Sequence, residues 1–295
     1  MMRLIITEEE KRHIKRLYEQ VDNKCQSNVS NELLNKSKQY WINWLKNSST
    51  ITKIISGLYS DDEIKKFTPE EFNKIRLNAK SSSDRAIKKI QDTNKIVYYN
   101  SDNMDDRRKY EDNPDVVMFV RNNFDGTVYV NCKTASIRTS EENLNIMIHE
   151  LQHVIHSEIK GKSGNLSTGM TTKRSPLISG PHTIKSPVSV DFGDEYLTKS
   201  YWKSKYDTLD QNMKTYVCDS NESQSRIAQT RQFLKLSPEQ DITKEMLKNK
   251  KVLNNLQAEL MCWGGREDNL SLDVFLSNLN QFANINKPNT LSGVT

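Results

Sequence analysis

The sequence predicts an α+β protein that is mainly helical, with a small antiparallel β-sheet packed on one long helix. Three observations predict this class. Helical apolar spacing fills most of residues 1–92, two β-rich runs meet at a turn within residues 115–132, and a capped amphipathic pattern covers about 140–160. We therefore divide the chain into a helical N-terminal region, residues 1–92, and a domain that carries the chemistry, residues 93–295.

Composition excludes several classes of protein. Of the 295 residues, 35% are hydrophobic and 27% are charged, with both signs mixed and a net charge of +5, which is typical of a folded, hydrophilic chain. No run approaches eighteen apolar residues, so no transmembrane helix is expected, and the apolar start is too short for a signal peptide. There is no phosphate-binding glycine loop and no nucleic-acid signature. We expect a soluble protein, cytoplasmic or virion-associated.

The N-terminal region is expected to consist of helices. Thr7 and Glu10 have capping-box spacing and begin a helix over 7–21, followed by a polar break at 23–31. An aromatic-rich helix around Tyr40–Leu45 and a third over 50–59 come next. Thr68-Pro-Glu-Glu71 starts a helix that runs to about residue 80, where three serines separate it from a shorter one over 84–91.

The four cysteines are widely spaced and contain no CxxC pair, so they are expected to be free thiols in a reducing compartment. They are Cys25, Cys132, Cys218 and Cys262.

Three strands are expected after residue 93. A short one covers 96–99, and longer candidates at 115–120 and 127–132 are rich in β-branched and aromatic residues. Asp125-Gly126 between the longer two supplies turn chemistry, which predicts an antiparallel hairpin.

The helix over 140–160 carries the clearest chemical signal. Thr139 and Glu142 repeat the capping box at its start. At about 100° per residue, His149 and His153 lie on one side of the helix, and the apolar residues gather on the other. Two imidazoles one turn apart can bind one Zn²⁺, and Glu150 between them can act on a bound water.

His149-Glu150-Leu151-Gln152-His153 matches the HExxH motif and resembles the zincin metallopeptidases, over residues 95–235 or so. The resemblance implies a motif helix under a sheet whose edge strand, here 127–132, lines the substrate cleft. His156 and Ile159 stand where the metzincin branch has Gly and His, so the chain is more similar to the gluzincin branch, which takes a Glu from a later helix.

Glu222 is the candidate for this third ligand. Asp219 can cap a helix that continues to about Leu234, which places Glu222 in the first turn and Arg226 one turn on, where it could orient the carboxylate. Alternatives remain at other acidic and histidine positions of the chain. These are Asp194, Glu195, His156, His182 and Glu259.

The chemistry of such a site predicts a zinc-dependent metalloendopeptidase. Glu150 serves as general base, and Tyr216, or else Tyr201, donates a hydrogen bond to the oxyanion. The expected substrate is a protein or peptide, peptidoglycan stem peptides included. The start of the chain resembles openings of bacteriophage proteins. The alternative function is a non-catalytic structural or binding protein whose metal site is structural or vestigial.

The remaining segments carry no motif. Residues 161–191 are rich in Gly, Ser, Thr, Pro and Lys, which is typical of either a lid beside the cleft or a surface insertion. Helices are expected over 243–249, 252–263 and 271–282.

Overall fold

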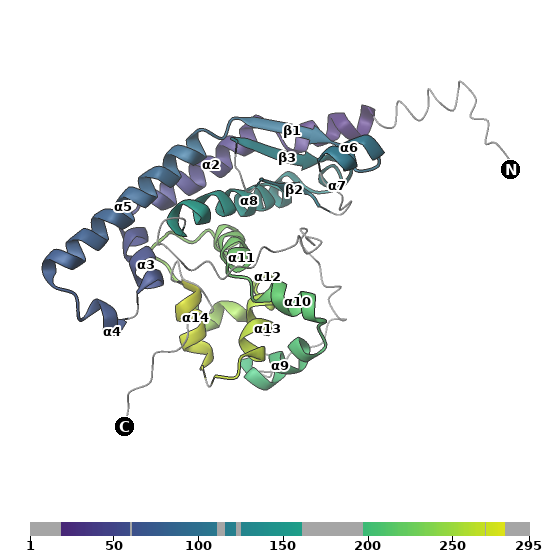
Figure 1. Cartoon of the computed structure of the whole chain (residues 1–295). Helices are drawn as coiled ribbons and strands as arrows, with labels where there is room; N and C mark the ends of the chain where they lie inside the picture. The colour runs from purple at the N-terminus through teal and green to yellow at the C-terminus, as the bar shows by residue number, and fades with distance from the viewer. Residues whose placement is uncertain are drawn as a thin grey trace, which may run out of the picture.

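The computed structural model is mainly helical with one three-stranded sheet, as expected for the fold class. Figure 1 shows the sheet and the long N-terminal helices on one side of α8 (Ser140–Lys160), with α11 (Ser220–Phe233) and the C-terminal helices on the other. The structure describes residues 19–59, 61–110, 116–121, 125–160, 197–268 and 270–280. The predicted start of the first helix, the insertion at 161–191 and the C-terminal tail lie outside these residues.

The N-terminal helices are longer than their sequence suggests. Residues 19–28 are helical, so the polar break predicted from residue 23 is wrong, and buried Cys25 and Val29 give that segment its apolar contacts. The break predicted at the serines 81–83 is also wrong. Ser83 is buried and its hydroxyl donates to the Leu45 carbonyl at 2.9 Å, so the serine favours packing between two helices. The helices are α2 (Asn31–Lys46), α3 (Ser48–Leu58), α4 (Asp61–Ile64) and α5 (Pro69–Gln91).

The sheet has the order β1-β3-β2, and the predicted hairpin is confirmed. β2 (Met118–Phe119) runs antiparallel to β3 (Thr127–Asn131), and Gly126 takes the positive φ of +80° that the turn requires. β1 (Lys95–Tyr99) is parallel to β3, so the sheet is mixed rather than antiparallel. The parallel strands β1 and β3 are joined by residues 100–126, which include α6 (Met104–Lys109) and β2, and a parallel pair needs such a long connection.

β3 is the central strand, which corrects the expectation that it lines the cleft as an edge. All five of its residues are buried, as its place between β1 and β2 requires. One face of the sheet packs with α2, α5 and α8 in a first hydrophobic core. Trp41 fastens α2 to α8, because its indole N–H donates to the Ile148 carbonyl at 3.0 Å. The N-terminal helices and the sheet therefore share one core, which crosses the boundary expected near residue 92.

A second hydrophobic core gathers the C-terminal helices, and α11 joins it to α8. Within this core α9 and α13 approach each other closely: a Cβ on Gly264 would lie 2.4 Å from backbone atoms of Trp202 and Lys203. Only glycine fits there. The remaining helices are α9 (Lys199–Asp207), α10 (Gln211–Val217), η2 (Lys244–Lys248), α12 (Lys250–Asn255), α13 (Gln257–Gly265) and α14 (Leu272–Asn280).

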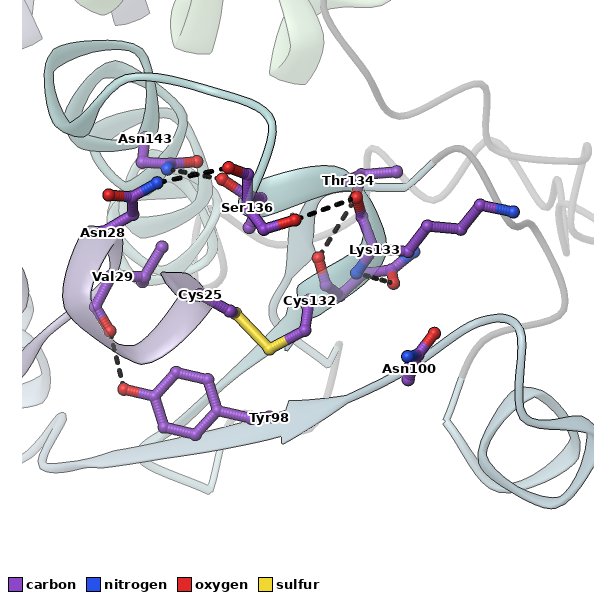
Figure 2. The surroundings of a disulfide bond; sticks show 12 residues. Cys25, Asn28, Val29, Tyr98, Asn100, Cys132, Lys133, Thr134, Ser136 and Asn143 are labelled. Carbon is purple, nitrogen blue, oxygen red and sulfur yellow. Dashed lines mark hydrogen bonds between the residues drawn. A yellow bond between two sulfur atoms is a disulfide. The ribbon is translucent and has the colours of Figure 1, made fainter. Parts of the chain in front are cut away.

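The expectation of four free thiols is wrong, since the cysteines form two disulfides. Cys25 is bonded to Cys132 and Cys218 to Cys262, each with Cα atoms 5.2 Å apart. Figure 2 shows the first at the end of β3, where the short α7 (Cys132–Ala135) begins. Next to it the Tyr98 hydroxyl donates to the Val29 carbonyl at 2.6 Å. Wide sequence spacing concealed these pairs because residues 107 and 44 positions apart meet only in the folded chain.

In the part of the chain that the structure describes, none of the helices has both the length and the apolar character needed to span a bilayer.

Candidate metal centre

α8 presents its two motif histidines toward α11. The predicted capping box is present: the Thr139 amide donates to the Glu142 carboxylate at 2.7 Å, and the Glu142 amide to the Thr139 hydroxyl at 3.2 Å. Apolar residues on the opposite side of α8 are buried in the first core, so the rotation of the helix is determined. They include Met147, Ile148, Leu151, Val154 and Ile155.

α11 brings Glu222 to the same place. As predicted, Glu222 lies in the first turn and its amide donates to the Asp219 carboxylate at 3.2 Å. Further along α11 the Gln229 side chain donates to the Asn145 carbonyl of α8 at 3.2 Å. The two helices thus cross with Glu222 against the histidine turns and Gln229 against an earlier turn of α8.

The three side chains form a compact group that could hold a metal ion. Glu222 Oε2 lies 3.3 Å from His149 Nε2, and Glu222 Oε1 lies 3.7 Å from His153 Nε2. Ligand atoms of all three residues lie within 4.8 Å of one another. Around a tetrahedral ion with bonds of 2.0–2.1 Å, neighbouring ligands are about 3.3 Å apart. Two imidazoles and one carboxylate at these separations therefore fit a small divalent cation.

The charges in the group favour the metal-binding forms of Glu222 and His153, whereas the carboxylate of Glu222 favours the protonated form of His149. Burial works to raise the pKa of Glu222, but the hydrogen bond from His149 and the charges of both histidines and Arg226 lower it to about 2. Burial and the charge of His149 lower the pKa of His153 to about 4. Burial also opposes the charge on His149, yet Glu222 outweighs it and raises the pKa. At neutral pH the carboxylate is ionised and His153 is neutral, as metal binding requires.

Glu150 lies on the neighbouring side of α8, beside β2. It is 6% exposed, and burial raises the pKa of its carboxyl to about 8, although the charge of His149 works against this. The Val120 backbone amide, directly after β2, donates a hydrogen bond to Glu150 and favours its ionised form. The strand beside the candidate base is therefore β2, the edge strand, and not β3.

Comparisons with protein-family models, with curated proteins and with solved structures find no match to the chain. The site is therefore interpreted from its own chemistry.

Arg226 acts differently from the expectation that it orients Glu222 directly. Its Nε donates to Glu259 Oε1 at 2.5 Å, and a second nitrogen donates to the Val217 carbonyl at 3.2 Å. Burial opposes the charge of Arg226, but Glu259 holds its pKa above the usual range. Arg226 thus influences Glu222 through its charge, while its hydrogen bonds fasten α11 to α13.

Tyr216, at the end of α10, lies near the group. Burial and the charge of Glu222 together raise the pKa of its hydroxyl to about 12, although the guanidinium of Arg226, 5.1 Å from the ring centroid, works to lower it. The hydroxyl therefore keeps its proton at neutral pH and can donate. Tyr201 belongs to the second core, with its ring edge-on to Trp202.

The other candidate ligands do not join the group in the described part of the chain. Glu259 is fully buried and paired with Arg226. His156 is 6% exposed and lies outside the cluster of ligand atoms. Asp194, Glu195 and His182 lie outside the described residues. Neither the Arg226–Glu259 pair nor the Val120 contact has a signal in the sequence, whereas the even number of cysteines could have suggested disulfides.

Proposed function

We propose that this protein is a zinc-dependent metallopeptidase of the HExxH type, similar to the gluzincin branch of the zincins. The observation that carries the proposal is the convergence of His149, His153 and Glu222 from two helices. Two histidines and one carboxylate are a common ligand set of catalytic zinc, which keeps a fourth position for water or substrate. A purely structural site would have no need of Glu150 beside the ligands.

Each side chain has a role that follows from its surroundings. A zinc ion held by His149, His153 and Glu222 would lower the pKa of a water molecule and polarise the scissile carbonyl. Glu150 accepts the proton of the attacking water and delivers it to the leaving amine. Its raised pKa in the metal-free protein suits the second step, and a neighbouring cation favours the ionised form needed for the first. The Tyr216 hydroxyl donates to the oxyanion that develops on the substrate.

The substrate class we propose is an extended peptide. The short β2 strand pairs with β3 on one side only among the described residues, so its other edge can accept a peptide strand beside Glu150. A protein or ordinary peptide substrate meets this requirement, and peptidoglycan stem peptides are the alternative substrate class. The two disulfides favour an oxidising environment over the cytoplasm, which leaves the virion or another site outside the cytosol as the preferred location.

Metal analysis combined with a base variant tests the proposal. The purified protein should contain zinc and cleave a casein-like substrate, and Glu150→Gln should retain zinc while its kcat falls by a factor of about 10²–10⁴. Glu222→Gln should lose zinc, whereas His156→Asn, a change on α8 outside the ligand group, should retain it. Zinc binding without any Glu150-dependent cleavage would instead support the non-catalytic structural or binding protein.

A further inference from the structure

Two links join α13 to the chain on either side of Glu222, one at the end of α10 and one in α11. The Cys218–Cys262 disulfide is anchored four residues before Glu222, at the C-terminal end of α10. The ion pair between Arg226 and Glu259 is anchored four residues after it, one turn along α11. Glu259 and Cys262 are themselves three residues apart, on one side of α13. We call the disulfide and the ion pair the α11 links.

The α11 links flank the ligand whose helix turn is held least firmly by its own helix. Glu222 stands in the first turn of α11, and terminal turns of helices fray more readily than interior ones. His149 and His153 need no such external support, because they lie in the middle of a helix whose opposite side is buried in the first core. The first turn of α11 must be held from outside if the carboxylate is to remain 3.3–3.7 Å from the two imidazoles.

Stability alone gives little reason for the ion pair. Glu259 is 0% exposed and the Arg226 side chain 11% exposed. A buried ion pair of this kind contributes little net stability, because the loss of hydration offsets the attraction between the charges. What the pair does provide is a fixed position for the start of α11, since Arg226 donates to Glu259 on α13 and to the Val217 carbonyl at the end of α10. Three helix segments are thereby held together around Glu222.

We propose that Glu259 and the Cys218–Cys262 disulfide are positioning elements of the metal centre, which hold the Glu222 carboxylate at ligand distance from the two histidines. This inference depends on the proposed metal role of His149, His153 and Glu222. Ligand positions must be maintained within about half an ångström for full affinity, and loss of supporting contacts around a metal site typically weakens binding about 10–100-fold.

The second disulfide is a matched control. Cys25–Cys132 closes a loop of 107 residues, compared with 44 for Cys218–Cys262, so the chain-entropy model predicts that its removal lowers overall stability more. Yet Cys25–Cys132 joins residue 25 to the end of β3, and none of the three ligands is among the residues labelled around it in Figure 2. If Cys218–Cys262 positions the ligand, its removal should weaken metal binding more than removal of Cys25–Cys132. Removal of Cys25–Cys132 should instead lower overall stability more.

Co²⁺ titration of the metal-free, oxidised full-length chain tests this, with visible absorption to report the geometry of the bound ion. Cys218→Ser with Cys262→Ser should weaken Co²⁺ binding about 10-fold or more and alter the spectrum. Cys25→Ser with Cys132→Ser should bind within about 3-fold of wild type and leave the spectrum unchanged, although it unfolds more easily.

Another variant tests the ion pair, and it still decides the question if the protein with Cys218→Ser and Cys262→Ser fails to fold. Arg226→Met with Glu259→Met replaces the pair by apolar side chains, a change that folds often tolerate. Loss of the nearby guanidinium should by itself strengthen cation binding, so weaker Co²⁺ binding here supports positioning. Wild-type affinity and spectrum in the folded variants would overturn the inference alone. Failure of the wild-type protein to bind Co²⁺ would overturn the inference and the proposed metal centre together.

Discussion

Replacing Glu150 by Gln should stabilise the metal-free protein while removing its activity. The folded state raises the pKa of this carboxyl from 4.5 to about 8, mainly through burial. Folded Glu150 therefore binds its proton more tightly than the unfolded chain does, and stability declines as the pH rises through that interval. Between pH 4.5 and pH 7 this lowers the free energy of unfolding by about 3 kcal/mol, which is about 2.5 pH units at about 1.36 kcal/mol per unit. At pH 5 the loss is only about 1 kcal/mol.

Gln removes this titration and keeps the volume of the side chain, and its carbonyl can still accept from the Val120 amide. Urea unfolding in the presence of a chelator should thus show Glu150→Gln to be more stable than wild type by up to about 3 kcal/mol at pH 7, with a difference that shrinks toward pH 5. Glu141→Gln, an exposed position on the same helix, is the control and should change stability by less than about 1 kcal/mol. Equal stability of wild type and Glu150→Gln at both pH values would refute the reasoning.

Three further substitutions test how the surrounding fold is held. Gly264→Ala should destabilise the protein by about 1–3 kcal/mol in urea unfolding, because the new methyl meets backbone. Gly265→Ala should be milder, because it meets only side-chain atoms of Tyr206, which move more easily than backbone, and equal losses would contradict this. Trp41→Phe removes the hydrogen bond to the Ile148 carbonyl and should lower the unfolding free energy by about 1–3 kcal/mol, and an unchanged midpoint would show that the bond is dispensable. Thr139→Ala removes the cap of α8 and should lower thermal stability by about 0.5–2 kcal/mol, with Thr139→Ser as the control that preserves it.

Local signals in the sequence were sufficient for the individual elements around the site. Capping boxes at Thr68 and Thr139 predicted where α5 and α8 begin, and both are present. The cap at Asp219 likewise placed Glu222 in a first turn. These predictions succeed because a cap and an apolar stripe act within one or two helical turns, so the residues that determine the element are also its neighbours in sequence.

Predictions failed where a distant partner decided the outcome. The serines at 81–83 resemble a helix break, but contact with α2 keeps α5 continuous through Ser83. Strand β3 has the pattern of an edge strand as much as of a central one, and only the pairing of β1 on its other side makes it central. The cysteines show no pattern of spacing at all, yet both pairs meet.

The candidate metal centre divides in the same way. The sequence by itself determined that His149, Glu150 and His153 share one helix, because helical periodicity places residues four apart on one side. Only the tertiary structure decided that Glu222 meets them, since the crossing of α8 and α11 depends on packing between segments some seventy residues apart. The α11 links were likewise decided only by the tertiary structure. A buried ion pair and a disulfide form between residues that are far apart in the sequence, so a pattern within one segment cannot predict them.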